Sequence, residues 1–317
     1  MINSKCIERY TDADAEEWNS FVARSKNGTF LFDRSYMDYH RDRFTDHSLI
    51  IRNNKGHIVA LIPANENDGI LYSHQGLTYG GLIMSTKSTL SEVNSIFSAL
   101  MVYLKDNGFS KMIYKPIPRT YHAYPSDEDL YALTNVCHAT IIKRMASSVV
   151  IIPDRIPLRQ NRRTALNKAY TENISVSISN DIDAFWTILE DNLRSVHNST
   201  PVHTAREMKS LMKANNGHIT LLMGYKDNTP LGGIVLYITP SVVHTQYISA
   251  TLEGKRLGVV DALIDYIFHH FPQHNLDIGT SAGDNGELLN EGLMFQKEGF
   301  GARSICYDTY EIDINHE

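Results

Sequence analysis

The strongest constraint on the fold is that one order of elements occurs twice along the chain. Each half reads as strand, strand, strand, helix, strand from its hydrophobic periodicity and turn residues. The first set comprises strands 48–52, 57–64 and 69–75, a helix over 90–104 and a strand at 111–118. The second set comprises strands 218–226, 232–238 and 242–250, a helix over 257–271 and a strand at 275–281. A doubly wound sheet would alternate strand and helix throughout, so the repeat predicts a duplicated α+β architecture.

The segment between the two sets predicts further helices. Residues 155–173 are helical in pattern and basic, and another apolar stripe follows at 182–189. Thr204 and Glu207 fit a capping box that opens one more helix. We place the domain boundary near residue 150, which gives domains 1–150 and 151–317. No Gly/Ser linker separates them.

Composition and charge exclude several classes of protein. Hydrophobic residues make up 42% of the chain and charged residues 21%, as in ordinary globular proteins. The formal net charge of −6 argues against a dedicated binder of duplex nucleic acid. Cys6, Cys137 and Cys306 are scattered and read as reduced thiols. The amino terminus lacks the pattern of a signal peptide, and no apolar run reaches the ~20 residues of a membrane span, so we expect a cytoplasmic protein.

Two local patterns suggest chemistry that the rest of the chain does not support. Residues 279–283 match the G-x-S-x-G turn of serine hydrolases. Such a fold needs an acid and a histidine downstream of Ser281, yet the only later histidine is His316. The histidines at 269, 270 and 274 cluster, but HExxH and neighbouring thiols are absent, so no metal site is predicted.

The turn after strand 242–250 is the most informative candidate site. A helix that begins there directs unpaired backbone N–H groups and a positive dipole at a bound phosphate. Gly258 would allow a ligand to approach the backbone, although a plain basic turn explains the sequence equally well. The predicted donor-binding residues are Ala250, Thr251, Lys255, Arg256, Leu257, Gly258 and Val259.

This turn resembles that of the GNAT acyltransferases, where [Q/R]-x-x-G-x-[G/A] cradles the pyrophosphate of acyl-CoA. The sequence from Lys255 matches the glycine at Gly258 and departs at Val260, where a small residue is expected. The duplication and several phrases resemble more specifically the FemAB-like group of tandem GNAT-fold proteins. These phrases are YSHQG (72–76) before YGG (79–81), KPIP (115–118) before Tyr121-His122, RR (162–163) with Lys168, and NEGL (290–293) before QKEGFG (296–301).

The resemblance implies a fold of two tandem GNAT-like domains, each a mostly antiparallel sheet flanked by helices. It implies an acyltransferase that moves an acyl group from an acyl-CoA-type donor to an amine or hydroxyl of a cell-surface glycan or peptidoglycan precursor. The first domain would be structural or acceptor-binding, and the second donor-binding and catalytic. The best known relatives use aminoacyl-tRNA; the net charge and the lack of a charged helical arm favour a small thioester. A catalytically silent binding protein of the same fold is the other alternative.

Acyl transfer needs a base and hydrogen-bond donors for the developing oxyanion. A backbone N–H within 247–250 could supply the oxyanion contact. His197 is the first candidate for the base, with an exposed helix-end histidine as the competing interpretation, and Glu291 is the second. Aromatic and amide groups beside glycines suit a sugar or peptide, although the same residues could merely turn the chain. The predicted acceptor-binding residues are His74, Gln75, Tyr79, Lys115, Tyr121 and His122.

Overall fold

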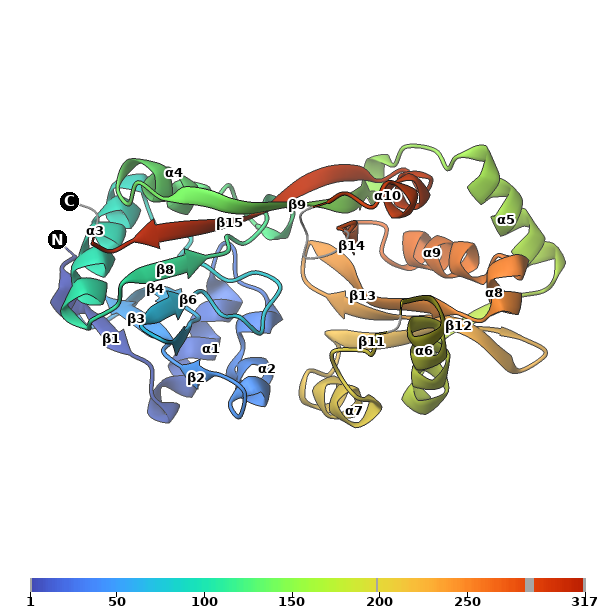
Figure 1. The fold of residues 1–317 in the computed structure, drawn as a ribbon, viewed down its shortest axis with the longest axis horizontal. Coiled ribbons are helices and arrows are strands. Elements are labelled where there is room, and N and C mark those ends of the chain that lie inside the picture. Colours follow the sequence, from blue (N-terminus) through green and yellow to red (C-terminus); the bar gives the residue numbers. More distant parts are fainter. Residues whose placement is uncertain (1, 198, 283–287, 316–317) are drawn as a thin grey trace. The chain divides into compact units, whose positions relative to one another are not determined.

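A computed structural model describes the chain except for residues 1, 198, 283–287 and 316–317 (Figure 1). Its contacts divide the chain into two compact units. Unit 1 comprises Met1–Met145 and Cys306–Glu317, and unit 2 comprises Ala146–Ile305. The division falls five residues before the predicted boundary, within one long strand, β9 (Thr140–Ile151). The carboxyl-terminal strand β15 (Arg303–Asp313) returns to unit 1, which the sequence pattern did not indicate.

Unit 1 contains two groups of hydrogen-bonded strands. The first has the order β1 (Ile7–Arg9), β3 (Leu49–Arg52), β4 (Ile58–Ile62) and β7 (Ile83–Met84). The second has the order β15, β8 (Lys111–Tyr114), β6 (Ile70–Tyr72), β5 (Asn65–Asn67) and β2 (Thr45–Asp46). The helices are α1 (Ala15–Arg24), α2 (Arg34–Met37), α3 (Leu90–Asp106) and α4 (Glu128–Asn135). Strands β6 and β8 are parallel, because α3 carries the chain back between them.

Unit 2 contains one sheet, in the order β10 (Ser175–Ser179), β11 (Ile219–Lys226), β12 (Thr229–Ile238), β13 (Val242–Ala250), β14 (Asn275–Thr280) and β9. Only β13 and β14 pair in parallel among these described strands. The helices are α5 (Gln160–Thr171), α6 (Ile182–His197), α7 (Ala205–Ala214), α8 (Leu252–Leu257), α9 (Val259–His270) and α10 (Glu291–Glu298). In Figure 1, α9 lies on one face of the β11–β13 sheet and α6 with α7 on the other.

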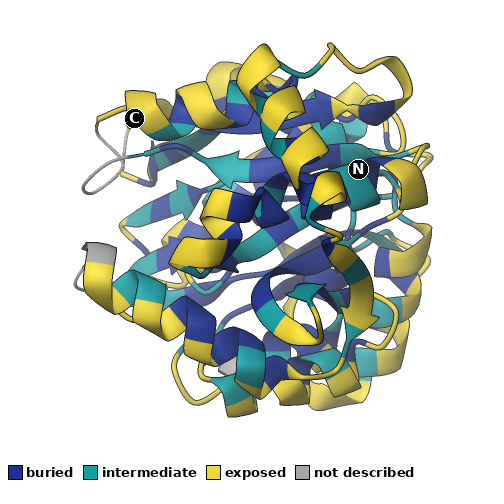
Figure 2. Ribbon diagram, turned by 90° about the vertical axis from the view of Figure 1, so that its right-hand side faces the viewer, coloured by how far each residue is buried: buried dark blue, intermediate teal, exposed yellow. Residues whose placement is uncertain are grey.

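Each unit has its own apolar core, built by the predicted stripes. Helix α3 buries Val93, Ile96 and Phe97 in unit 1, and α9 buries Leu263 and Ile264 in unit 2. In Figure 2 the buried residues concentrate on the strands, and exposed residues lie mainly on helices and loops. The predicted α+β fold with a strand–helix–strand repeat is thereby confirmed, as is the capping box at the start of α7.

The predicted helix over 257–271 needs one correction, because the helical segment begins earlier and is interrupted. Helix α8 ends at Gly258, which adopts a left-handed conformation with φ +80°, and α9 starts at the next residue. The apolar stripe continues across this break, so periodicity alone did not reveal it.

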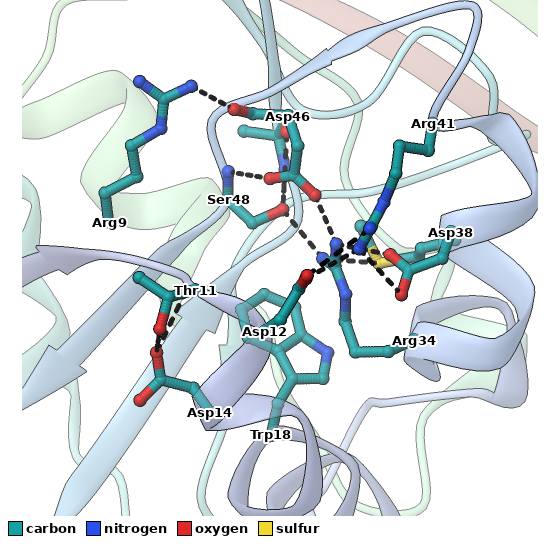
Figure 3. A network of polar contacts seen from close by, with 12 residues as sticks. Arg9, Thr11, Asp12, Asp14, Trp18, Arg34, Asp38, Arg41, Asp46 and Ser48 are labelled. Carbon is teal, nitrogen blue, oxygen red and sulfur yellow. Dashed lines mark hydrogen bonds and ion pairs between the residues drawn. The ribbon is translucent and has the colours of Figure 1, made fainter.

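A buried guanidinium organises the polar centre of unit 1 (Figure 3). Arg34 is 3% exposed and donates to Asp38 at 2.7 Å, to Asp46 and to Ser48 at 3.3 Å. Its guanidinium carbon lies 3.8 Å from the centroid of the Tyr10 ring. Burial alone would raise the pKa of Asp46, but the Arg34 guanidinium and the hydrogen bonds from Ser48 together outweigh it and hold that pKa below its ordinary value.

We expect Arg34→Met to lower the free energy of unfolding by about 3 kcal/mol, because it removes the buried cation that Asp38 and Asp46 share. Arg41→Met is the matched control: Arg41 is 56% exposed and also pairs with Asp38, so its loss should cost less than about 1 kcal/mol. Urea unfolding measures both. Equal losses in the two variants would contradict the structural role of Arg34.

Candidate active site

The parallel strands β13 and β14 separate partway along their length. Their pairing covers Val242 to His244 on β13 and Asn275 to Asp277 on β14. Beyond His244, the described partner of β13 is β12 alone. The strand edge of 245–250 is therefore open on the side that β14 leaves, and open strand edges present backbone N–H groups to ligands.

A β-bulge decides which side chains of β13 share a face. His244 lies opposite Tyr237, whereas Tyr247 lies opposite Val235, so Gln246 is the extra residue. Directly opposed residues point to the same face, and alternate positions of β12 share one face. The bulge therefore brings His244 and Tyr247 onto one face, although three residues separate them. Ser249 follows on that face and donates to the carbonyl of Ile188 on α6 at 3.3 Å.

His244 and Asp277 form a pair where the two strands part. Nδ1 of His244 lies 3.3 Å from Oδ2 of Asp277, which is fully buried. The other carboxylate oxygen, Oδ1, accepts from the Ser147 hydroxyl at 2.7 Å and from the Gly279 N–H at 2.8 Å. These contacts fix the carboxylate beside the imidazole of His244.

Lys297 of α10 lies at the carboxyl end of β14. The side chain is buried, and its ammonium group donates to the carbonyls of Gly279 at 2.9 Å and Thr280 at 2.8 Å. Burial lowers the pKa of Lys297 to about 8, partly opposed by Asp277. An ammonium has three N–H groups, so these two bonds leave one for a ligand.

A second pair on the shared face involves Tyr247. Its hydroxyl lies 2.7 Å from Nδ1 of His203, in the connection between α6 and α7. The Trp186 indole N–H donates to the carbonyl of His203 at 3.2 Å, and the Trp186 ring packs edge-on to Tyr247 with centroids 5.3 Å apart. Both members of the pair are thus held by α6.

A cavity of about 920 Å³ lies at the carboxyl end of β13. This volume falls within the range of small-molecule sites. Its walls come from α6, the start of β12 and the turn into α8, and include Ile188, Asn192, Arg194, Leu231, Thr251 and Leu252.

The structure separates the predicted donor-binding residues into two groups. Ala250 and Thr251 line the cavity. The exposed Lys255 on α8 donates to Asn192 in the cavity wall, and Arg256 is exposed beside it. Leu257, Gly258 and Val259 are buried instead. A Cβ on Gly258 would lie 2.2 Å from the Ala165 carbonyl oxygen of α5, so a helix occupies the space expected for a ligand. Packing against neighbouring elements explains why Leu257, Gly258 and Val259 are buried. Their predicted contact with the donor stays a prediction from the sequence.

Of the two predicted bases, the structure describes the side chain of Glu291 alone. His197 ends α6, and its side chain is outside what the structure describes. Glu291 is the exposed first residue of α10. Ser281 is fully buried, which differs from the exposed nucleophile of a hydrolase turn. Within the described residues, no three His, Cys, Asp or Glu side chains are arranged to hold a metal ion.

The predicted acceptor residues come together in unit 1. Lys115 donates through its ammonium to the carbonyl of Leu77 at 2.6 Å, and its own carbonyl accepts from the Gly80 N–H at 2.9 Å. The rings of Tyr79 and Tyr121 lie 4.8 Å apart. Burial lowers the pKa of Lys115 to about 8.

The remaining acceptor candidates belong to the same two loops. The His122 Nε2 lies 2.9 Å from the Ile117 carbonyl, and the Gln75 N–H donates to the side chain of Asn65 at 2.7 Å. His74 is 3% exposed and Tyr79 is equally buried. These contacts fix the loops, and acceptor binding there stays a prediction.

Sequence reasoning missed the residues that the structure places around the separated strands. His203, His244, Asp277 and Lys297 come from different elements of unit 2. Lys297 stands within the phrase 296–301 that carries the family resemblance, but the phrase itself gives no chemical role. The described residues include no helix with the length and apolar content needed to cross a membrane.

No family model and no curated protein matches this sequence. Solved structures do match in fold. FemX is 10% identical, with a TM-score of 0.68 over 98% of this chain and 97% of its own. The C-terminal domain of a putative lysylphosphatidylglycerol synthetase from Agrobacterium fabrum is 13% identical, with a TM-score of 0.59 over 96% and 92%.

A tandem GNAT protein from the clavulanic acid biosynthesis pathway, solved without AcCoA, is 9% identical, with a TM-score of 0.52 over 98% and 99%. These likenesses extend over nearly the whole of each chain. They confirm at the level of the fold the resemblance seen in the sequence: the chain has the tandem GNAT-type α+β fold that FemX also has.

Proposed function

We propose that this protein is an acyltransferase whose donor binds in unit 2, along the open edge of β13 and in the cavity at its carboxyl end. The observation that carries the proposal is the separation of β13 from β14 beyond His244, with a buried ammonium at the end of β14. An open strand edge can donate N–H groups to the acyl oxygen, and Lys297 adds a positive charge. Both would stabilise an oxyanion that develops during transfer.

An acyl-CoA-type thioester is the donor we favour. The cavity is of suitable size for a small-molecule donor. Most of its wall is apolar, with Arg194 as a cation and Asp191 and Glu253 as carboxylates in the same wall. The acceptor would be an amine or hydroxyl of a cell-surface glycan or peptidoglycan precursor. The similar structures include a domain of a putative lysylphosphatidylglycerol synthetase and a tandem GNAT protein, which supports the wider class of acyl transfer.

Aminoacyl-tRNA is the rival donor, and the contacts of the basic segment weigh against it. Arg155 to Lys168 holds five basic residues. Arg159 pairs with Glu298 at 2.9 Å, and Arg162 pairs with buried Asp261 at 3.3 Å. Two of the five charges are thus engaged within unit 2 rather than presented to a polyanion.

Calorimetric titration with acetyl-CoA and with free CoA tests the donor site. Leu252 is 86% exposed beside the cavity, so replacing it should not disturb folding. We expect Leu252→Glu to weaken binding about tenfold or more, because its carboxylate repels the donor phosphates. Leu252→Gln, of the same size without the charge, should bind within about threefold of wild type.

Absence of binding to the wild-type protein would overturn the acyl-CoA donor and direct the search to charged tRNA. Binding that Leu252→Glu and Leu252→Gln weaken equally would place the phosphates elsewhere. Binding without transfer to any acceptor would favour a silent binding protein.

A further inference from the structure

Tyr247 stands at a distinctive point of the proposed donor site. It lies three residues beyond the place where β14 leaves β13 and three residues before Ala250, which lines the cavity. The bulge at Gln246 turns its side chain to the face that carries His244. Tyr247 is only partly buried, so part of its side chain is accessible to a ligand.

The partner of Tyr247 is fixed in position. His203 is 6% exposed, and its Nδ1 lies 2.7 Å from the Tyr247 hydroxyl. The Trp186 indole N–H donates a hydrogen bond to the backbone carbonyl of His203. The next residue, Thr204, is the N-cap of α7 and forms a capping box with Glu207. A histidine held this firmly can exchange a proton with one defined group.

The surroundings keep the phenol protonated. Burial raises the pKa of Tyr247 and outweighs hydrogen bonding from the His203 backbone and the Gln246 side chain, which acts in the opposite direction. The charge of Glu207 on α7 adds a smaller contribution in the direction of burial. The Glu207 carboxylate already accepts from the N–H and hydroxyl of Thr204, at 2.6 and 3.0 Å. From α6, the neighbour that packs against Tyr247 is the uncharged Trp186.

We propose that Tyr247 and His203 form the proton relay of the acyl transfer, which makes them the general base for the acceptor. The inference rests on the proposed function. The acceptor N–H or O–H gives its proton to the Tyr247 oxygen while the phenol proton passes to Nδ1 of His203. The acceptor atom bonds to the acyl carbon, and the carbon–sulfur bond then breaks. The imidazolium returns its proton along the same path to the leaving thiolate, so both residues end as they began.

The relay is tested by comparing two nucleophiles with acetyl-CoA as the donor and release of the CoA thiol as the signal. Water must lose a proton to attack, whereas hydroxylamine is uncharged at neutral pH and depends far less on a base. We expect Tyr247→Phe and His203→Gln to slow the water reaction about 100-fold and the hydroxylamine reaction about threefold or less. The wild-type water reaction should depend on pH, and that dependence should be lost in His203→Gln.

Controls separate the relay from a structural role. Tyr247→Phe keeps the ring that packs on Trp186. Tyr225→Phe is the matched control: it removes a phenol hydroxyl on β11 whose one hydrogen bond among the contacts described is to Ser179, at 3.2 Å. Both should bind acetyl-CoA as wild type does, and Tyr225→Phe should keep the wild-type melting temperature and both rates. Tyr247→Phe should lower the melting temperature only slightly, through the loss of its hydrogen bond with His203.

Each other outcome is decisive. If the wild-type protein binds no acetyl-CoA, or binds it and releases no CoA with either nucleophile, the proposed function fails and the relay fails with it. If CoA is released but Tyr247→Phe keeps the wild-type pH profile, the relay alone is overturned. In that case selective loss of the water reaction in His244→Gln would identify His244 as the base.

Discussion

Replacing Lys297 by methionine should lower acetyl-CoA turnover with hydroxylamine by about 100- to 1,000-fold, the usual cost of removing one oxyanion donor. The buried ammonium stands at the end of β14 with one N–H left for a ligand after its two carbonyl bonds. The pH dependence gives a second readout. Because the pKa of Lys297 is lowered to about 8, the cation is lost as the pH rises through 8, and the rate should fall with it.

The conservative variant distinguishes charge from packing. Lys297→Arg keeps a cation that does not titrate near pH 8, so the falling limb should disappear while part of the rate remains. Lys297→Met also leaves the carbonyls of Gly279 and Thr280 without their donor, so melting curves and acetyl-CoA affinity must accompany the rates. A rate for Lys297→Met within about threefold of wild type would exclude Lys297 from oxyanion stabilisation.

The repeat was visible in the sequence because alternation and helical periodicity report burial directly. Strand β13 occupies the predicted 242–250, and α3 follows the predicted stripe. Strand β15 escaped prediction because exposed and partly buried residues dominate its pattern, which leaves little alternation to detect. Which unit a long strand ends in depends on the strands with which it pairs after folding, and the pattern of a single sequence does not give that pairing.

The site was harder to predict than the fold, since its parts meet only after folding. His203 and Tyr247 are 44 residues apart, yet their side chains lie in hydrogen-bond contact. The bulge at Gln246 places His244 and Tyr247 on one face, whereas simple alternation would separate them. The turn at 250–259 could be found in the sequence because it contains glycine and basic residues. The same residues are compatible with a bound ligand or with a neighbouring helix packed against the turn, so the sequence does not decide between the two.

Gly258→Ala should destabilise unit 2 by roughly 2–5 kcal/mol, through left-handed strain and overlap with a neighbouring helix. The φ of +80° disfavours any residue with a Cβ, and that Cβ would lie 2.2 Å from the Ala165 backbone oxygen. Gly56 is the matched control: its φ is +78° but nothing lies within 4 Å of its Cβ position, so Gly56→Ala should show the strain alone. Urea unfolding measures the difference. If Gly258→Ala costs no more than Gly56→Ala, α5 does not pack here as described, and the space beside Gly258 is open to a donor after all.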